Sequence, residues 1–349
     1  MFYFYIFLVA FVLSALLTVA VGKIAFYFRV VDEPGQVGSL SRKIHIQTTP
    51  LLGGLAIFFS YFIILFLLSD HFFSGTLHWS HLIGFSVGAL IIAGGGILDD
   101  KYNLKSQQQI IFPVLAIGAL IWGGVSIEKI TNPFGGVLNL HSLFFISPFF
   151  IFLWMMGMMY TTKLLDGVDG LVSGLGAIGG FIIFLFTLTT RYYQPDIALA
   201  AILLTGVSVG FLVFNWHPAK IFLGEGGSLL IGYILGVLAI ISGAKIAMAL
   251  LVMGIPIMDV AWTIIRRLAL GQNPFKTADR SHLHHRLLSL GLSQPLTVGI
   301  FYILSLSFGL SGLWLQSRGK FLALLALGAL MFFLVVSFWG LDHYKKKHV

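Results

Sequence analysis

The sequence predicts an all-α, polytopic integral membrane protein. Of its 349 residues, 58% are hydrophobic and only 10% are charged, whereas an ordinary soluble domain carries about 25% charged residues. Apolar runs of roughly 20 residues, the length that an α-helix needs to cross a bilayer, recur along the whole chain. The longest polar connections are 23–50 and 266–295, which leaves no room for an inserted soluble domain. We therefore expect one multi-span domain over residues 1–349.

About eleven transmembrane helices are expected from these apolar runs. Their ranges are 2–22, 51–69, 82–98, 110–124, 143–159, 171–190, 197–216, 226–243, 246–265, 296–316 and 321–341. The first range has no basic segment before it and no clear small-residue cleavage site after it. We therefore expect a retained span and not a cleaved signal peptide.

The charges predict how the chain is oriented in the membrane. With eleven spans, one side of the membrane collects 16 of the 21 Lys and Arg residues. The positive-inside rule makes that side cytoplasmic, with the N-terminus outside and the C-terminus inside. Ten of the 13 acidic residues fall on the same side, although acidic residues contribute little to orientation. A bias in carboxylates therefore indicates a chemical site on the cytoplasmic face.

The composition also narrows the classes of partner and chemistry. The net charge of +8 favours membrane orientation and anionic lipid or phosphate partners over nucleic acid. The chain has no cysteine, which excludes disulfides, thiol catalysis and zinc sites built on cysteine.

Two pairs of carboxylates stand at expected helix ends. Asp99 and Asp100 follow three glycines at the end of the third span, and adjacent acids repel unless a cation or basic groups hold them. A solvated helix end is the alternative. Asp166 and Asp169 precede the sixth span, with glycines that let a backbone approach a ligand closely. For that pair, favourable capping of a helix N-terminus also remains open.

The loop at 215–228 combines several groups that suit a nucleotide. Asn215 offers an amide, Phe222 an aromatic face and Glu225 a carboxylate, and glycines lead into the next span. Such a set can hold a base, a metal and phosphate oxygens together. Phe222 has the alternative of ordinary core packing in so Phe-rich a chain.

Three histidines and two arginines lie within eight residues before the tenth span. They are Arg280, His282, His284, His285 and Arg286. A transition-metal site and a phosphate-binding cluster are the two interpretations, and the flanking arginines favour phosphate.

Two further groups complete the polar face. Arg42, Lys43 and His45 precede the second span, either as a basic entrance to a site or as a positive-inside anchor. Asp259 lies at membrane depth near the end of the ninth span, where a carboxylate is expected to be functional or paired.

In this order, the motifs resemble the polyprenyl-phosphate N-acetylhexosamine-1-phosphate transferase family, also called glycosyltransferase family 4. The resemblance covers about 32–288, and the His-x-His-His form is similar to the UDP-GlcNAc:undecaprenyl-phosphate GlcNAc-1-phosphate transferase branch. The matching blocks are DEP with RKIH and PLLGG, then GILDDK, LLDGVDGL, NWHPAKIFLGEGGS and finally PIMD with RR and DRSHLHH.

The resemblance implies an enzyme of bacterial cell-surface glycan synthesis. Such an enzyme moves a HexNAc-1-phosphate, here expected to be GlcNAc-1-phosphate, from a UDP-sugar to undecaprenyl phosphate and releases UMP. It requires Mg²⁺, with Mn²⁺ as a substitute, and works at the cytoplasmic face of the inner (plasma) membrane. The sequence leaves open the UDP-sugar, the pathway (O-antigen of lipopolysaccharide, teichoic acid linkage or another glycan) and whether the chain forms a homodimer.

The resemblance also assigns roles to single residues. Asp99 and Asp100 would engage the lipid phosphate, and Asp166 and Asp169 would act as catalytic or metal-organising acids. The implied metal ligands are Glu225, Asp100 and Asp169. The implied substrate-binding residues are Lys43, His45, Lys163, Asn215, Phe222, Arg280, His282, His284 and His285.

The chain departs from the family pattern at three positions. Glu225 stands where the family has a metal-binding Asp, and Tyr160 and Lys163 stand where it has two asparagines. Lys163 is expected to pair with Asp166 or to supply charge against phosphate. These changes leave open a diverged or inactive paralogue with a scaffold role. A secondary transporter is a further alternative, although transporters hold their ionisable groups near mid-span and not at one face.

Overall fold

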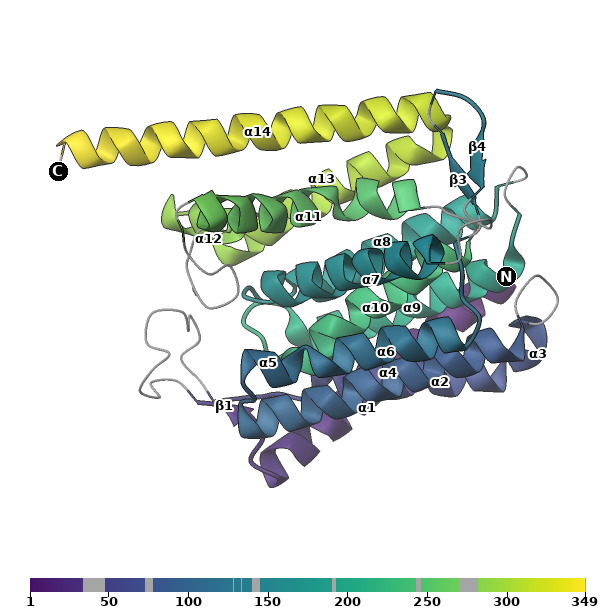
Figure 1. Cartoon of the computed structure of the whole chain (residues 1–349). Helices are drawn as coiled ribbons and strands as arrows, with labels where there is room; N and C mark the ends of the chain where they lie inside the picture. The colour runs from purple at the N-terminus through teal and green to yellow at the C-terminus, as the bar shows by residue number, and fades with distance from the viewer. Residues whose placement is uncertain are drawn as a thin grey trace.

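The computed structural model describes residues 1–33, 48–72, 78–127, 129–132, 134–139, 145–189, 193–242, 246–269, 271 and 282–348. Over this range the chain folds into a bundle of α-helices with two short β-pairs (Figure 1). The all-α prediction is therefore confirmed. Lys43, His45 and Arg280 lie outside the described residues.

Eight of the described helices are long and apolar enough to cross a membrane. They are α1 (Phe2–Tyr27), α4 (Trp79–Tyr102), α7 (Ile146–Leu165), α9 (Pro195–Asn215), α10 (Gly224–Ile241), α11 (Ile246–Ala269), α13 (Gln294–Trp314) and α14 (Ser317–His348). The protein is thus a multi-pass membrane protein.

Shorter elements complete the bundle. The short helices are α2 (Gly53–Leu67), α3 (Ser69–Phe72), α5 (Ser106–Gln109), α6 (Ile111–Trp122), α8 (Leu171–Thr187) and α12 (Leu283–Ser289). The antiparallel pairs join β1 (Val31–Asp32) to β2 (Thr49–Pro50) and β3 (Lys129–Thr131) to β4 (Val137–Asn139). Each of the eleven expected spans overlaps a helix, but α2, α6 and α8 are shorter than a full span. The count of eleven and the orientation therefore stay predictions.

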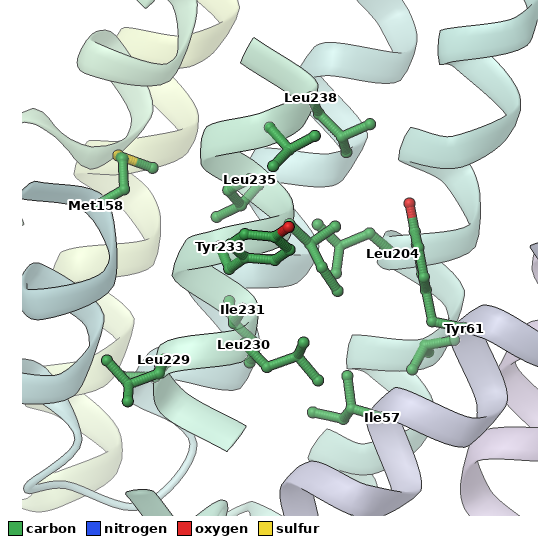
Figure 2. Packing of buried hydrophobic residues seen from close by; sticks show 14 of the residues in the cluster. Ile57, Tyr61, Met158, Leu204, Leu229, Leu230, Ile231, Tyr233, Leu235 and Leu238 are labelled. Carbon is green, nitrogen blue, oxygen red and sulfur yellow. The ribbon is translucent and has the colours of Figure 1, made fainter. Parts of the chain in front are cut away.

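Helix α10 forms the centre of the bundle. In its membrane-length window 89% of residues are buried, against 17% for α14, which lies at the periphery. Figure 2 shows Leu230 and Tyr233 of α10 among side chains of the neighbouring helices, including Tyr61 of α2 and Met158 of α7. The first turn of α10 carries Glu225, so whatever packs around that turn builds the site.

Glycines allow two helices to cross the start of α10 at close range. A Cβ placed on Gly96 of α4 would lie 2.2 Å from the Cα of Gly226, and one on Gly54 of α2 would lie 2.4 Å from the Cα of Gly227. No side chain fits at either crossing, and small residues at such contacts are the usual means of close helix packing in membranes. The crossing at Gly96 brings the acidic end of α4 to the first turn of α10.

The motif-bearing segments share one end of the bundle. In Figure 1, β1, α5 and α12 lie at one end together with the C-terminus, whereas the N-terminus, α3 and the β3–β4 hairpin lie at the opposite end. The helices α4, α7 and α9 all end on the side of β1 and α12, so the loops that follow them can meet.

Candidate active site

Asn215 joins the two central loops of the site. It is buried at the last position of α9, where its side-chain oxygen accepts hydrogen bonds from the backbone N–H of Gly170 (3.1 Å) and the hydroxyl of Ser173 (2.8 Å). Its Nδ2 donates to the carbonyl of Ile221 (2.9 Å). The amide therefore fixes the loop at 166–170 against the loop at 216–223. Direct contact between Asn215 and a nucleotide stays a prediction.

The turn into α8 depends on glycine. Gly170 is the residue before α8 and has φ +79°, a left-handed conformation that glycine adopts at little cost. The hydroxyl of Tyr302 in α13 donates a hydrogen bond to the Gly170 carbonyl. Tyr302 lies beyond the motif-bearing region, and no feature of the sequence indicated it.

Asp169 is held by the opposite loop. Its Oδ2 lies 2.7 Å from Nδ1 of His217 and accepts a hydrogen bond from the backbone N–H of Ala219 (3.2 Å). His217 is not among the residues predicted from the sequence. Its position in the same block as Asn215 was the available signal, but only the fold shows that this block faces Asp169.

The two adjacent acids of α4 have different surroundings. Asp99 is buried, and its Oδ1 accepts hydrogen bonds from the backbone N–H of Leu104 (2.9 Å) and from Nε2 of Gln109 (3.0 Å). Asp100 turns to α10, where its Oδ1 accepts a hydrogen bond from the backbone N–H of Glu225 (2.9 Å). Asp99 thus orders the connection between α4 and α5, while Asp100 faces the other acids.

Glu225 is paired with Lys163. The Lys163 Nζ lies 2.8 Å from Oε2 of Glu225 and donates a hydrogen bond to Oε1 of Gln109 (2.9 Å). From the sequence, a pair with Asp166 was one of two expectations for Lys163, but the ion pair in the structure is with Glu225. The reason is the helix packing, which sets the last turn of α7 beside the first turn of α10.

The charges of three other acidic side chains act on Asp166. This partly buried carboxyl has a pKa well above its ordinary value, chiefly because burial disfavours its charged form. The negative charges of Glu225, Asp100 and Asp169 raise the pKa further. Carboxylates from the ends of α4 and α7, the start of α10 and the loop before α8 therefore act on one another in one cluster, which we call the acid cluster: Asp100, Asp166, Asp169 and Glu225.

Asp259 anchors the histidine segment. Its Oδ1 accepts a hydrogen bond from the backbone N–H of Leu283 (2.8 Å), and its Oδ2 lies 3.0 Å from Nδ1 of His282. The side chains of Asp259 and His282 are both buried. The expectation that Asp259 is functional or paired is thus met by pairing. His282 uses one ring nitrogen in this contact, which fixes the start of α12.

His284 and His285 lie against the acid cluster. A Cβ placed on Gly167, between Asp166 and Asp169, would lie 3.3 Å from Nε2 of His284 and 3.6 Å from Nε2 of His285. The His284 side chain is fully buried, and neither ring nitrogen has a hydrogen-bond partner within the described part of the chain.

The charge state of His284 follows from this environment. Burial lowers its pKa well below the ordinary value of a histidine, and the neighbouring His285 and His282 lower it further. The ring is therefore neutral at neutral pH and has one nitrogen that can donate and one that can accept a hydrogen bond.

The segment at 50–54 is hydrogen-bonded to the loop at 216–223. The backbone N–H of Phe222 donates to the carbonyl of Pro50 (2.9 Å), and those of Gly53 and Gly54 donate to the carbonyls of Phe222 (3.0 Å) and Leu223 (2.8 Å). The ring of Phe222 is half-buried. Residues just before this segment include Lys43 and His45, which fall outside the described range.

The donor chemistry of the acid cluster fits a hard divalent cation. Mg²⁺ prefers carboxylate oxygens. A cation would relieve the repulsion that, after burial, raises the pKa of Asp166. Among the residues that the structure describes, however, no three acidic or imidazole side chains already form a ligand set. Asp100, Asp166 and Asp169 would hold a cation, while Glu225 is engaged by Lys163.

The bundle of membrane helices thus gathers carboxylates, a lysine and histidines at one end, a set of groups suited to phosphate chemistry. Residues 82–243 match the model of glycosyl transferase family 4. A probable undecaprenyl-phosphate N-acetylglucosaminyl 1-phosphate transferase of Bacillus subtilis (strain 168) is 31% identical over 338 residues, covering 94% of this chain and 90% of the relative.

Two other relatives widen the comparison. The decaprenyl-phosphate N-acetylglucosaminephosphotransferase of Mycobacterium tuberculosis (strain CDC 1551 / Oshkosh) is 31% identical and covers 75% of this chain and 71% of its own length. The phospho-N-acetylmuramoyl-pentapeptide-transferase of Borreliella burgdorferi (strain ZS7) is 31% identical, and the match covers 82% of this chain and 86% of the relative. The chain therefore belongs to glycosyl transferase family 4, and it is a sugar-1-phosphate transferase by class. The predicted family is confirmed, and relatives of the GlcNAc-1-phosphate branch support the predicted branch.

Proposed function

We propose that the protein transfers a HexNAc-1-phosphate, specifically GlcNAc-1-phosphate, from UDP-GlcNAc to undecaprenyl phosphate. An oxygen of the lipid phosphate attacks the phosphorus that carries the sugar, and the bond from that phosphorus to the oxygen of UMP breaks. UMP leaves, and the sugar stays on the lipid through a new diphosphate. The observation that carries the proposal is the convergence of the acid cluster with His284 and His285 at one end of the bundle.

Phosphoryl transfer depends mainly on positioning and on neutralising phosphate charge. When bound, Mg²⁺ or Mn²⁺ would supply that neutralisation between the two substrates, held by Asp100, Asp166 and Asp169. We assign to Asp166, within the acid cluster, the removal of a proton from the lipid phosphate, whose second pKa is about 6. We assign Asp99 to positioning, because its side chain orders the turn that presents Asp100.

The remaining predicted residues are assigned to substrate binding. His284 and His285 are assigned the hydrogen bonds to the diphosphate, and their position against Gly167, between Asp166 and Asp169, supports this assignment. The half-buried Phe222 ring offers a stacking face for uracil. Asn215 supports this set by fixing both loops, while Lys43, His45 and Arg280 are proposed contributors from segments outside the described range.

We further propose that this end of the bundle faces the cytoplasm at a bacterial plasma membrane and that the chain crosses the membrane eleven times. The supporting observation is the excess of Lys and Arg in the connections at the site end. UDP-sugars are cytoplasmic substrates under this arrangement, and a lipid phosphate at the inner leaflet reaches a site built at helix ends.

The experiment is a panel of UDP-N-acetylhexosamines supplied to the purified full-length protein with undecaprenyl phosphate and Mg²⁺. Mass spectrometry of the lipid fraction is expected to detect a lipid-linked diphosphate sugar with UDP-GlcNAc, together with an equal amount of UMP. Failure with every donor would remove the enzymatic function. If vesicles carrying the same protein then accumulate solute, the transporter is the better account.

A further inference from the structure

Lys163 is part of a closed ring of contacts at the acid cluster. Asp99 Oδ1 accepts from Gln109 Nε2 (3.0 Å), and Gln109 Oε1 accepts from Lys163 Nζ (2.9 Å). Lys163 Nζ pairs with Glu225 Oε2 (2.8 Å), and the Glu225 N–H donates to Asp100 Oδ1 (2.9 Å). Since Asp99 and Asp100 are neighbours in the chain, the ring closes on itself.

The three positions at which the sequence departs from the family pattern are in contact within this group. The ammonium of Lys163 lies 5.9 Å from the centre of the Tyr160 ring, in the range of a cation–π contact. On its other side it reaches Glu225. The departures therefore form one physical unit and not three unrelated changes.

Lys163 and a divalent cation would compete for the same carboxylate. The Lys163 side chain is 13% exposed, so solvent screens its charge much less than that of a surface lysine. Glu225 is a hard oxygen donor of the kind that Mg²⁺ uses, but its Oε2 already faces the ammonium.

Resting on the proposed function, we propose that Lys163 is a resident counter-ion of the acid cluster that withholds Glu225 from a divalent cation and so lowers the metal affinity of the substrate-free enzyme. Cation binding then depends more strongly on the diphosphate of the UDP-sugar, which offers additional oxygen ligands. Lys163 thereby acts as a positioning residue that couples cation binding to substrate binding.

The length of Glu225 is matched to this role. Glu225→Asp removes one methylene, about 1.5 Å of reach, which opens the contact with Lys163 Nζ from 2.8 Å to roughly 4 Å, the limit of an ion pair. A shortened carboxylate at this position is freed from the lysine. Glu225→Asp and Lys163→Met should therefore change metal affinity in the same direction and through the same contact.

The test measures Mn²⁺ binding by electron paramagnetic resonance to the purified full-length protein in detergent, without UDP-sugar. Lys163→Met is expected to tighten Mn²⁺ binding by about tenfold or more, since one positive charge near the site is removed. Glu225→Asp is expected to tighten binding as well. The gain in Mn²⁺ affinity of the double variant should be smaller than the product of the two single gains, because both substitutions remove the same interaction.

Two matched controls separate this effect from a general change of charge. Lys101→Met removes a positive charge from an exposed lysine next to Asp100 and should change Mn²⁺ affinity less than twofold. Lys163→Arg keeps the charge and should stay near the wild-type affinity. If Lys163→Met proves unstable in size-exclusion chromatography, Glu225→Asp alone carries the test.

Unchanged or weaker Mn²⁺ binding in Lys163→Met or, where that variant is unstable, in Glu225→Asp overturns the inference, as does an equal gain in Lys101→Met. The result is separable from the proposed function. If wild-type protein makes no lipid product with any donor, the proposed function fails while the Mn²⁺ affinities still decide the role of Lys163.

Discussion

The two ends of the helical bundle use polar side chains in different ways. At the site end, the hydrogen bonds of Asn215, Asp259 and Asp169 join segments 23 to 50 residues apart. At the opposite end, the backbone N–H of Ile127 donates to the Ser147 hydroxyl and Arg318 Nη2 donates to the carbonyl of Phe134, and neither of these contacts uses a carboxylate. Ionisable side chains that are buried in a membrane protein are costly, so the carboxylates that carry the contacts at the site end indicate that function, and not only folding, has shaped that end.

Loss of Asp166 should give the largest effect on activity. Asp166→Asn removes a carboxylate from the centre of the acid cluster, and we expect kcat/KM for lipid product to fall by about a thousandfold, in the range typical for a group that both positions and transfers a proton. Asp196→Asn provides the matched control, because Asp196 is a buried carboxylate near the start of α9, at the other end of that helix from Asn215. Comparable activity loss in both variants would contradict the distinction between the two ends.

Asp166→Asn should also change the thermal stability of the protein. The folded-state pKa of Asp166 is raised, so the ionised form destabilises the folded protein at neutral pH. Asp166→Asn should therefore melt at a higher temperature than wild type at pH 7. The difference should shrink as the pH falls through the raised pKa, where the wild-type carboxyl takes up a proton. A melting temperature below that of wild type at pH 7 would speak against a buried, repelled carboxylate.

The glycine crossing offers a second comparison within one helix. Gly96→Ala would set a methyl group against the backbone of Gly226, whereas a Cβ on Gly94 meets nothing within 4 Å. Gly96→Ala should push α4 away from α10, separate Asp100 from Glu225 and reduce kcat/KM by about a hundredfold. Gly94→Ala should keep activity and gain up to about 1 kcal/mol in helix propensity. Transferase assays and thermal melting of both variants check this pair.

Substitution of Asn215 tests whether the link between the two loops affects activity more than the loss of a single buried hydrogen bond elsewhere. Asn215→Ala removes the acceptor for Gly170 and Ser173 and the donor to Ile221, and leaves their buried groups unsatisfied at about 1–3 kcal/mol each. We expect about a tenfold or larger loss of kcat/KM together with a lower melting temperature. Ser14→Ala, which removes one buried bond from α1 to Val207, should lower stability slightly and leave turnover intact. Normal turnover in Asn215→Ala would show that the loops hold without it.

The smallest expected effect concerns His284 and pH. Its folded-state pKa is lowered, so the unfolded chain binds more protons than the folded chain once the pH falls below about 6.5, the ordinary value. The melting temperature of the wild type should therefore fall more steeply between pH 7 and pH 5 than that of His284→Gln, because glutamine takes up no proton in this range. Parallel pH profiles for the two proteins would mean that His284 is not held neutral by burial.

The sequence was sufficient to predict the class of fold and the family, and it grouped residues that the fold brings close together. Apolar runs located each long helix, and the ordered motifs brought Asp100, Asp166, Glu225 and His284 into one hypothesis before any contact was known. It did not distinguish the neighbours Asp99 and Asp100, because their directions depend on the crossing of α4 over α10 at Gly96. The partner of Lys163 was missed for the same reason, since the rotation of α7 against α10 is set by packing.

Residues that support the site were the hardest to predict. Gln109 lies in a short polar turn without any motif, and Tyr302 lies in an apolar helix where a tyrosine carries no signal. Their roles come from contacts across 54 and 132 residues of sequence. Such contacts follow from tertiary packing, which local patterns do not encode.

The central claim is that the acid cluster and the paired histidines form a single diphosphate-and-cation site. A structure of the full-length protein with UDP-GlcNAc and Mn²⁺, with the metal located by its anomalous scattering, tests this most directly. The account predicts one Mn²⁺ contacted by Asp100 and Asp166, with the diphosphate between it and His284. A metal bound elsewhere, or a nucleotide away from the loop at 166–170, would contradict the claim.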